Sequence, residues 1–269
     1  MNGHAEPLTV LSLFAGIGGL ELGLERAGMR VVGQVEIDPF ARSVLARHWP
    51  EVPRHDDVRT APAWWAGAVR PRVDVVAGGF PCQPFSVAGR RRGVADERWG
   101  WPWMLDVVRA VRPRFVVVEN VPGLVRDRDA FGWVLGDLAE HGFDAEWSLL
   151  RACSVGAPHV RERLLLVAHA HGVDGQEWLG AGPELGVPRQ ARGVSARVGG
   201  SAAARAWRHR VDRAVETSRA DDRNAHGLAG RMVAAGGNAV VPAVAEHIGH
   251  RVTAHAATTE HPTRKENRA

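Results

Sequence analysis

The first 28 residues constrain the fold most, because they predict a strand, a glycine-rich turn and a helix in direct succession. Residues 9–13, Thr-Val-Leu-Ser-Leu, form an apolar run with the length of a buried strand. The turn at residues 14–19 leads into Leu20, Leu24 and Ala27 at helical spacing. This is the pattern of the first unit of a doubly wound, Rossmann-like α/β sheet, whose glycine turn aims backbone N–H groups at a ligand.

The glycine turn lacks the Gly-x-Gly-x-x-Gly fingerprint, so NAD is not the first expected ligand. A second apolar run, residues 31–35, ends at Glu36, and an acidic residue there can accept hydrogen bonds from ribose hydroxyls. The alternative is a solvated carboxylate at a strand end. Residues 39–48 predict a helix that begins with Pro39. The segment His55-Asp56-Asp57-Val58 follows, and an Asp within it could accept a hydrogen bond from an adenine amino group.

A stiff loop surrounds the first of the two cysteines. Residues 73–77 predict a short buried strand, and the two glycines after it permit a sharp turn or a close approach to a ligand. Pro81 and Pro84 restrict the backbone on either side of Cys82. Open α/β sheets place their chemistry at the carboxyl ends of strands. The alternative is a small buried hydrophobe, but a packing cysteine needs neither the glycines nor the prolines.

The cysteine loop carries a family resemblance. Residues 79–86, Gly-Phe-Pro-Cys-Gln-Pro-Phe-Ser, resemble the catalytic loop of the DNA (cytosine-5)-methyltransferases. Glu119-Asn120-Val121, which follows the predicted strand at 115–118, resembles the segment whose glutamate holds the target cytosine in that family. The resemblance covers roughly residues 8–168 and 231–253, with its motifs in the family's order.

Two later segments match the family with departures. The family commonly has Gln-x-Arg-x-Arg before a late strand; here His159 replaces the glutamine, while Arg161 and Arg163 stay in register. In an extended segment these two arginines point the same way, which suits a joint grip on an anionic or carbonyl group. Residues 98–103 depart from the common Arg-Gly-x-Leu pattern, so no cofactor contact is assigned there.

The resemblance implies that S-adenosylmethionine is the cofactor. The glycine turn would pass its methionine part, the acidic residue after the second strand would hold the ribose, and an Asp with an aliphatic neighbour would flank the adenine. A Gly-Asn-x-Val motif near the C-terminus would return to the cofactor. The matching cofactor positions are Phe14, Ala15, Gly16, Gly18, Gly19, Glu36, Ile37, Asp57, Val58, Gly79, Pro81, Asn238 and Val240.

The resemblance also implies the reaction, methyl transfer to C5 of cytosine in double-stranded DNA through a covalent adduct. The thiolate of Cys82 would add to C6 of a flipped-out base, because C5 of an aromatic, neutral ring is a poor nucleophile. Arg161 or Arg163 would lower the pKa of this thiol. Glu119 would bind N3 and the exocyclic amino group, and the arginines would stabilise O2. The expected DNA contacts are Gln83, Ser86, Arg90, Arg91 and Arg92.

The predicted domain organisation has four parts. Residues 1–170 form the catalytic domain, and residues 171–230 form a reduced target-recognition region, rich in Gly, Ala and Arg, which is short, atypical or partly disordered. Residues 231–254 return to the catalytic domain through a helix that packs beside the first helix, and residues 255–269 are a polar tail. The helix presents one apolar face, made by Val241, Val244, Ala245, Ile248 and Val252.

Composition adds little about function. The formal net charge is +4, and Lys265 is the only lysine, a bias that we attribute to a GC-rich genome. With Cys82 and Cys153 alone, no disulfide framework is suggested, so a reducing bacterial cytosol is expected. No signal peptide, membrane-spanning run or metal site is expected. The expected partners are double-stranded DNA and, beyond a monomer, a separate recognition subunit or a cognate restriction endonuclease.

The setting expected for such an enzyme is a bacterial or phage restriction-modification system, or an orphan methyltransferase. Three alternatives stay open. A catalytically silent remnant that binds DNA or cofactor would fit the eroded recognition region. A split enzyme would take its recognition domain from a partner chain. A tRNA cytosine methyltransferase of the same fold is the least favoured, because no distinctive signature for RNA is evident.

Overall fold

A computed structural model describes residues 6–82, 99–156, 161–170 and 240–259. Its strands form one sheet of seven in the order β3-β2-β1-β4-β5-β7-β6. The strands are β1 (Thr9–Leu13), β2 (Arg30–Val35), β3 (Arg54–His55), β4 (Val75–Gly78), β5 (Phe115–Asn120), β6 (Phe143–Arg151) and β7 (Glu162–Ala170). The helices of the described part are α1 (Gly19–Arg26), α2 (Pro39–His48), α3 (Ala61–Ala66), α4 (Trp101–Val111), α5 (Gly123–Arg126), α6 (Arg128–Glu140), the 3-10 helix η3 (Ala152–Val155) and α9 (Pro242–Thr259).

The sheet confirms the doubly wound architecture. Strands β1 to β5 run parallel to one another, whereas β7 lies antiparallel between β5 and β6. The carboxyl ends of β1, β2, β4 and β5 therefore meet at one edge, and the beginning of β7 lies at that same edge. Ligands of open α/β sheets bind outside this edge, so the fold places the predicted site residues there.

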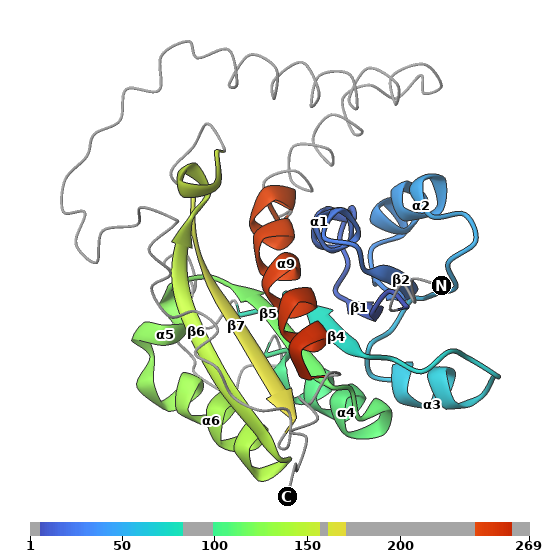
Figure 1. Cartoon of the computed structure of the whole chain (residues 1–269). Coiled ribbons are helices and arrows are strands. Elements are labelled where there is room, and N and C mark those ends of the chain that lie inside the picture. Colours follow the sequence, from blue (N-terminus) through green and yellow to red (C-terminus); the bar gives the residue numbers. More distant parts are fainter. Residues whose placement is uncertain (1–5, 83–98, 157–160, 171–239, 260–269) are drawn as a thin grey trace, which may run out of the picture.

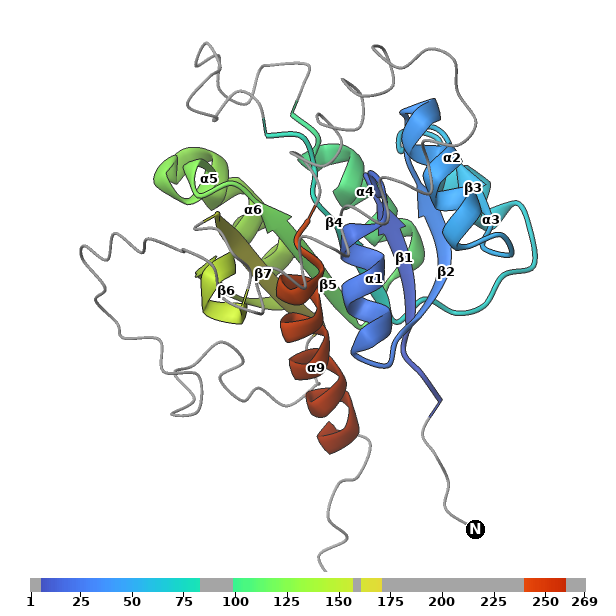
Figure 2. The same ribbon diagram turned by 90° about the horizontal axis from the view of Figure 1, so that it is seen from above.

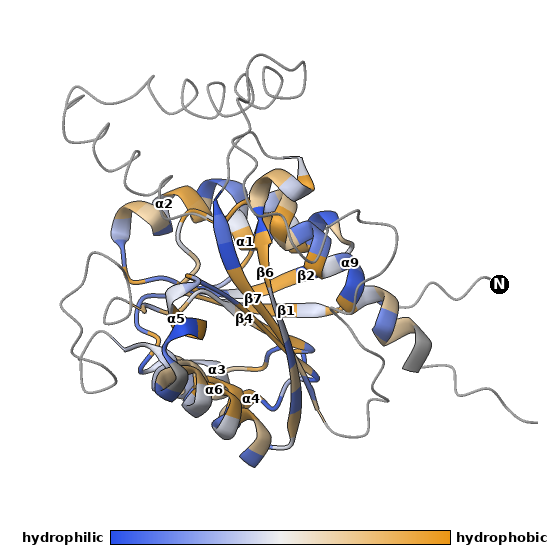
Figure 3. Cartoon of the chain, turned by 90° about the vertical axis from the view of Figure 1, so that its left-hand side faces the viewer, coloured by the Kyte–Doolittle hydropathy of each residue, from blue (hydrophilic) through white to orange (hydrophobic). Residues whose placement is uncertain are grey.

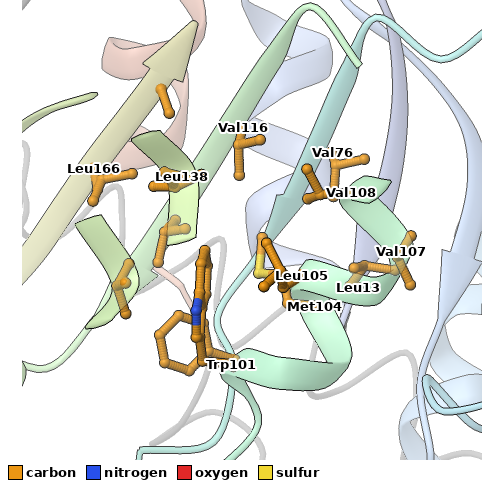
Figure 4. Close-up of a cluster of buried hydrophobic side chains, with 14 of the residues drawn as sticks. Leu13, Val76, Trp101, Met104, Leu105, Val107, Val108, Val116, Leu138 and Leu166 are labelled. Carbon is orange, nitrogen blue, oxygen red and sulfur yellow. The ribbon is translucent and has the colours of Figure 1, made fainter. Parts of the chain in front are cut away.

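Helices cover both faces of the sheet, as Figure 3 shows with α1, α2 and α9 on one side and α3, α4 and α6 on the other. Each face has its own apolar core. On the α4 and α6 side, Trp101 and Met104 of α4 and Leu138 of α6 pack on strand residues such as Val116 (Figure 4). On the α1 and α9 side, the core is built from the alternate residues of the same strands. Strands buried on both faces explain the continuous apolar runs of the sequence.

The C-terminal helix α9 lies alongside α1, as Figures 1 and 2 agree. The predicted apolar stripe of this helix is buried against the sheet and α1, which confirms its expected packing. The helices approach closely at Gly23, where a side chain would collide with the carbonyl oxygen of Pro242 and the methyl group of Ala245. The helix continues to Thr259, past the boundary at residue 254, because His255 and Ala256 are also buried.

Two predicted regions lie outside the described residues, namely the segment at 171–230 and most of the predicted tail at 255–269. Among the helices that are described, none has the length and apolar character needed to cross a bilayer.

Candidate active site

Three elements bring the predicted catalytic residues to one edge of the sheet. Cys82 follows β4, Glu119 lies within β5, and Arg163 lies at the start of β7. Because β7 runs antiparallel to β5, Glu119 pairs with Leu165, and Arg163 is the diagonal neighbour on the same face. Register between two strands therefore joins residues that are 44 positions apart in the chain, counted from 119 to 163.

Glu119 and Arg163 form a close ion pair in which Nε of Arg163 lies 3.0 Å from Oε1 of Glu119. Glu119 is only 8% exposed, and this burial raises the pKa of its carboxyl group, although the guanidinium groups of Arg163 and Arg161 oppose the rise. Arg163 also donates to the carbonyl of Glu162 over 2.8 Å, which fixes the guanidinium plane. A buried carboxyl with a raised pKa can keep or share a proton, as a group facing N3 of cytosine requires.

The third predicted residue of this group, Arg161, is the first residue of the described range 161–170. It lies close enough to Glu119 and Arg163 for their charges to act on its guanidinium group. Burial and the charge of Arg163 lower the pKa of the Arg161 guanidinium, while Glu119 raises it. The structure thus brings Glu119, Arg161 and Arg163 together, as predicted from the spacing of the two arginines.

The loop that carries Cys82 is held against β5. The side-chain amide of Asn120 donates to the carbonyl oxygen of Phe80 over 3.1 Å. Gly79 lies against the carboxylate of Glu119, since a Cβ there would be 3.3 Å from its Oε2. The sequence identified Asn120 only as part of a motif, and its role in holding the cysteine loop comes from the structure.

Cys82 itself is 7% exposed and forms an isolated antiparallel bridge with Trp99. A hydrogen bond of 3.1 Å from the Gly100 N–H to the Pro81 carbonyl closes this pairing. Burial, followed by the negative charge of Asp127, raises the pKa of the Cys82 thiol to about 12. The expectation that Arg161 or Arg163 lowers this pKa is therefore wrong for the protein as described, because the nearest acting charge is a carboxylate.

The glycine turn after β1 opens toward the same edge. Phe14, Gly16 and Gly18 have left-handed backbone conformations with φ of 53°, 56° and 92°. A Cβ at Gly16 would meet no atom within 4 Å, so the turn borders open space where a ligand can approach. Ala15 ties the turn to β2 by donating its N–H to the carbonyl of Val35 over 3.1 Å.

Glu36 bridges this turn and the end of β2. Its Oε2 accepts the N–H of Gly16 at 2.7 Å, and its Oε1 accepts the N–H of Asp38 at 2.8 Å. Each oxygen keeps a further lone pair, so the carboxylate can still accept two ribose hydroxyls. Next to it, Ile37 is 69% exposed, so its apolar side chain is accessible to a ligand that lies along Glu36.

The carboxylate of Asp57 binds Arg59, a residue that the sequence did not single out. Arg59 donates its Nη2 to Oδ2 of Asp57 at 2.6 Å and its backbone N–H to Oδ1 at 2.9 Å. These bonds lower the pKa of Asp57 to about 2. The pair lies beside Val58, which is buried. An Arg two residues after an Asp is the only signal that the sequence offered.

The C-terminal segment reaches the glycine turn, because a side chain at Gly19 would collide with the carbonyl oxygen of Val240. The remaining predicted positions, Gln83, Ser86, Arg90, Arg91, Arg92 and Asn238, lie outside the described residues.

The family model for C-5 cytosine-specific DNA methylases matches residues 8–190, which is more than half of the chain. The chain belongs to this methylase family.

Relatives in the methylase family are type II methyltransferases. The chain is 37% identical over 170 residues to the type II methyltransferase M.NaeI of Lentzea aerocolonigenes, covering 61% of this chain and 40% of that protein. It is 38% identical over 186 residues to M.Eco47II of Escherichia coli, covering 63% and 42%. Among solved structures, the Dnmt2 methyltransferase of S. pombe matches with a TM-score of 0.52 and 24% identity over 63% of this chain and 52% of that one, which supports the fold.

The chain spans about half or less of the length of these methylase relatives. Members of the family are generally S-adenosylmethionine-dependent, and the open glycine turn with the Glu36 carboxylate fits the ribose and methionine parts of that cofactor.

Proposed function

We propose that this chain transfers a methyl group from S-adenosylmethionine to C5 of cytosine in double-stranded DNA. The observation that carries the proposal is the buried Glu119–Arg163 pair beside the Cys82 loop, at the sheet edge that also holds the open glycine turn. Neither an apolar core nor a plain binding surface requires a buried carboxyl, two arginines and a cysteine on one edge.

The residues proposed to hold the cofactor act on different parts of it. Glu36 would accept the ribose hydroxyls, Ile37 would pack on the adenine, and Asp57 would accept the adenine amino group in place of one of the four contacts that Arg59 makes to its two oxygens. The turn that contains Gly16 and Gly18 would lie along the methionine part. S-adenosylmethionine supplies an electrophilic methyl group when bound.

The proposed chemistry begins at Cys82. Its sulfur forms a bond to C6 of cytosine, and the electron pair of the C5–C6 double bond moves toward C5 and on to N3 and O2. Glu119 donates its proton, or a share of it, to N3, and Arg163 stabilises the negative charge at O2. Carbon C5 then has the electron density to take the methyl group. Loss of the C5 proton, for which water is the proposed acceptor, restores the C5–C6 double bond and breaks the C6–S bond, so the sulfur leaves as a thiolate. The aromatic ring is restored when N3 returns its proton to Glu119.

The raised pKa of Cys82 determines when its thiol can lose its proton and attack C6. In the protein without substrate the thiol is neutral, so it must lose its proton when cytosine enters the site rather than before. We propose that the substrate complex supplies the positive environment that the free protein lacks at Cys82.

DNA is the proposed macromolecular partner. A stacked cytosine cannot reach Cys82, so the base must leave the duplex, at a cost of a few kcal/mol that phosphate contacts offset. We propose Gln83, Ser86 and the arginines at 90–92 for these contacts. The type II methyltransferase relatives favour a restriction-modification or orphan setting in a bacterial or phage cytosol.

The test measures transfer of labelled methyl groups to mixed-sequence duplex DNA. Wild type is compared with Cys82→Ala, and Cys153→Ala serves as the matched control because Cys153 is the other cysteine of the chain and belongs to η3 rather than to the Cys82 loop. The proposal expects 5-methylcytosine from wild type and from Cys153→Ala, and none from Cys82→Ala. If all three variants label DNA equally, Cys82 is not the nucleophile and the proposed mechanism is wrong.

A partner-dependent enzyme is the second candidate, favoured by the coverage of only 40% to 42% of the length of the two relatives above. It predicts that the isolated chain binds S-adenosylhomocysteine without methylating DNA, and that a separate recognition subunit restores transfer. Calorimetry with S-adenosylhomocysteine separates this outcome from a chain that binds no cofactor at all.

A further inference from the structure

A buried carboxyl group lies behind the glycine turn, and the mechanism above does not use it. Glu21 is in the first turn of α1 and has no exposed surface. Within the part of the chain that the structure describes, neither of its carboxyl oxygens has a hydrogen-bond partner. A buried polar group without a partner is unfavourable by roughly 1–3 kcal/mol, so the structure must compensate for Glu21 in another way.

Two further polar side chains, Ser12 and Gln34, are buried on the side of the sheet that α1 covers, and together with Glu21 they are called the buried polar layer. A register shift between Val10 and Leu11 aligns Ser12 of β1 with Gln34 of β2, on the face of the sheet that α1 covers. Both residues are fully buried. The Ser12 hydroxyl lies close enough to the Glu21 carboxyl group to act on its pKa, but neither this hydroxyl nor Nε2 of Gln34 makes a well-aligned hydrogen bond among the described residues.

The layer connects to the glycine turn from two sides. The Oε1 atom of Gln34 accepts from Arg54 at 3.3 Å, and the same Arg54 nitrogen donates to the carbonyl of Trp49 at 2.6 Å. The Trp49 ring in turn lies where a side chain at Gly18 would be. On the other side, the Glu36 carboxylate, which holds Gly16, is close enough to repel a charge on Glu21.

Among the described residues, the charges that act on Glu21 are negative. They belong to Glu36 after β2 and to Glu25 on α1. Burial raises the pKa of Glu21 to about 7, although the neighbouring Ser12 hydroxyl opposes the rise. A neutral carboxylic acid therefore suits this place better than a carboxylate does, because it adds no second negative charge next to Glu36.

An internal water molecule makes two to four hydrogen bonds. The unpaired polar atoms of Glu21, Ser12 and Gln34 can supply such bonds. We propose that Glu21, in its uncharged form, is a positioning residue of the cofactor site, and that it shares internal water with Ser12 and Gln34. Through this layer it keeps the glycine turn and Glu36 in the arrangement that binds the cofactor. The part about the cofactor rests on the proposed function, whereas the protonation state and the water do not.

The test uses three proteins: wild type, Glu21→Gln, which imitates the neutral acid, and Glu25→Gln, which changes a half-buried carboxylate on the same helix as a matched control. Affinity for S-adenosylhomocysteine is measured by calorimetry between about pH 6 and 8.5, around the pKa of Glu21. Ionised Glu21 repels Glu36, so the affinity of wild type and Glu25→Gln should fall about fivefold as the pH rises. Glu21→Gln should bind at every pH as wild type does at pH 6.

A wild-type affinity that stays constant over this range, or a Glu21→Gln protein with the wild-type pH profile, would overturn the positioning role.

Infrared spectroscopy gives a second readout that needs no cofactor. A carboxylic-acid C=O band near neutral pH should be present in wild type, weaker in Glu21→Gln, where the buried Glu119 can still contribute, and unchanged in Glu25→Gln. A band of equal strength in wild type and Glu21→Gln refutes the uncharged form. A crystal structure that shows no water within hydrogen-bond distance of Glu21 refutes the water site. The infrared and crystallographic results stand even if the chain methylates nothing.

Discussion

The charge that acts on Cys82 is the carboxylate of Asp127, which lies 45 residues further along the chain. Asp127 is the N-cap of α6, where its side chain accepts the N–H of Ala130 at 3.1 Å. Its negative charge adds to the effect of burial on the thiol. In the free protein Cys82 is therefore a neutral thiol.

The first prediction concerns the reactivity of this thiol. In the free protein, iodoacetamide should alkylate Cys82 slowly at pH 8, because a thiol with a pKa of about 12 has almost no thiolate there. Asp127→Asn should increase the rate severalfold, since it removes the repelling charge and keeps a good N-cap residue. Mass spectrometry in a Cys153→Ser background gives the rate for Cys82 alone. An unchanged rate would show that Asp127 does not set the pKa.

The second prediction concerns the buried ion pair. Glu119→Gln should lower kcat by about 10²- to 10⁴-fold, because the amide cannot deliver a proton to N3. Its affinity for S-adenosylhomocysteine should stay within about twofold of the wild-type affinity, a small change set by the distance of Glu119 from the glycine turn. Single-turnover methylation and calorimetry give the two values. Loss of both kcat and cofactor affinity would show a structural rather than a chemical role for Glu119.

The third prediction follows from the grip of Arg59 on Asp57. Arg59→Ala should raise the pKa of Asp57 from about 2 toward its ordinary value of 3.8. A carboxyl with a lowered folded-state pKa stabilises the fold above its unfolded pKa and loses that effect as the pH falls. In wild type this loss should extend from about pH 4 to pH 2, and the variant should lack it. NMR titration of the Asp57 side chain measures the shift, and an unshifted pKa contradicts the assignment.

The fourth prediction concerns the packing of α9 on α1. Gly23→Ala should destabilise the protein by more than about 2 kcal/mol, because the new methyl group meets the Pro242 carbonyl, and backbone cannot move aside cheaply. Gly132→Ala in α6 is the matched control, since its Cβ meets no atom within 4 Å. That change should stabilise by about 0.5–1 kcal/mol, as alanine favours helices. Urea denaturation compares the two, and equal midpoints would contradict the contact.

Much of the fold could be predicted from local patterns. The strand at Thr9–Leu13 and the helix at Pro39–His48 have the predicted bounds, because an apolar run and an N-terminal proline are local signals. The short helices α3 and α5 were missed, since six and four residues carry too little periodicity. The end of α9 was placed too early because burial of His255, a polar residue, depends on which surface it meets.

The candidate site, like the fold, could be predicted from the sequence only in part. The sequence by itself determined which residue types stand at the carboxyl ends of the strands, and so the positions of Glu36, Cys82 and Glu119, because these depend on motif and spacing along the chain. Only the tertiary structure decided what surrounds them. The ion pair of Glu119 depends on the antiparallel register of β7, and the neutral Cys82 thiol on burial and a distant carboxylate. Electrostatic effects act through space at a few ångströms, and neighbours in space are not neighbours in the chain.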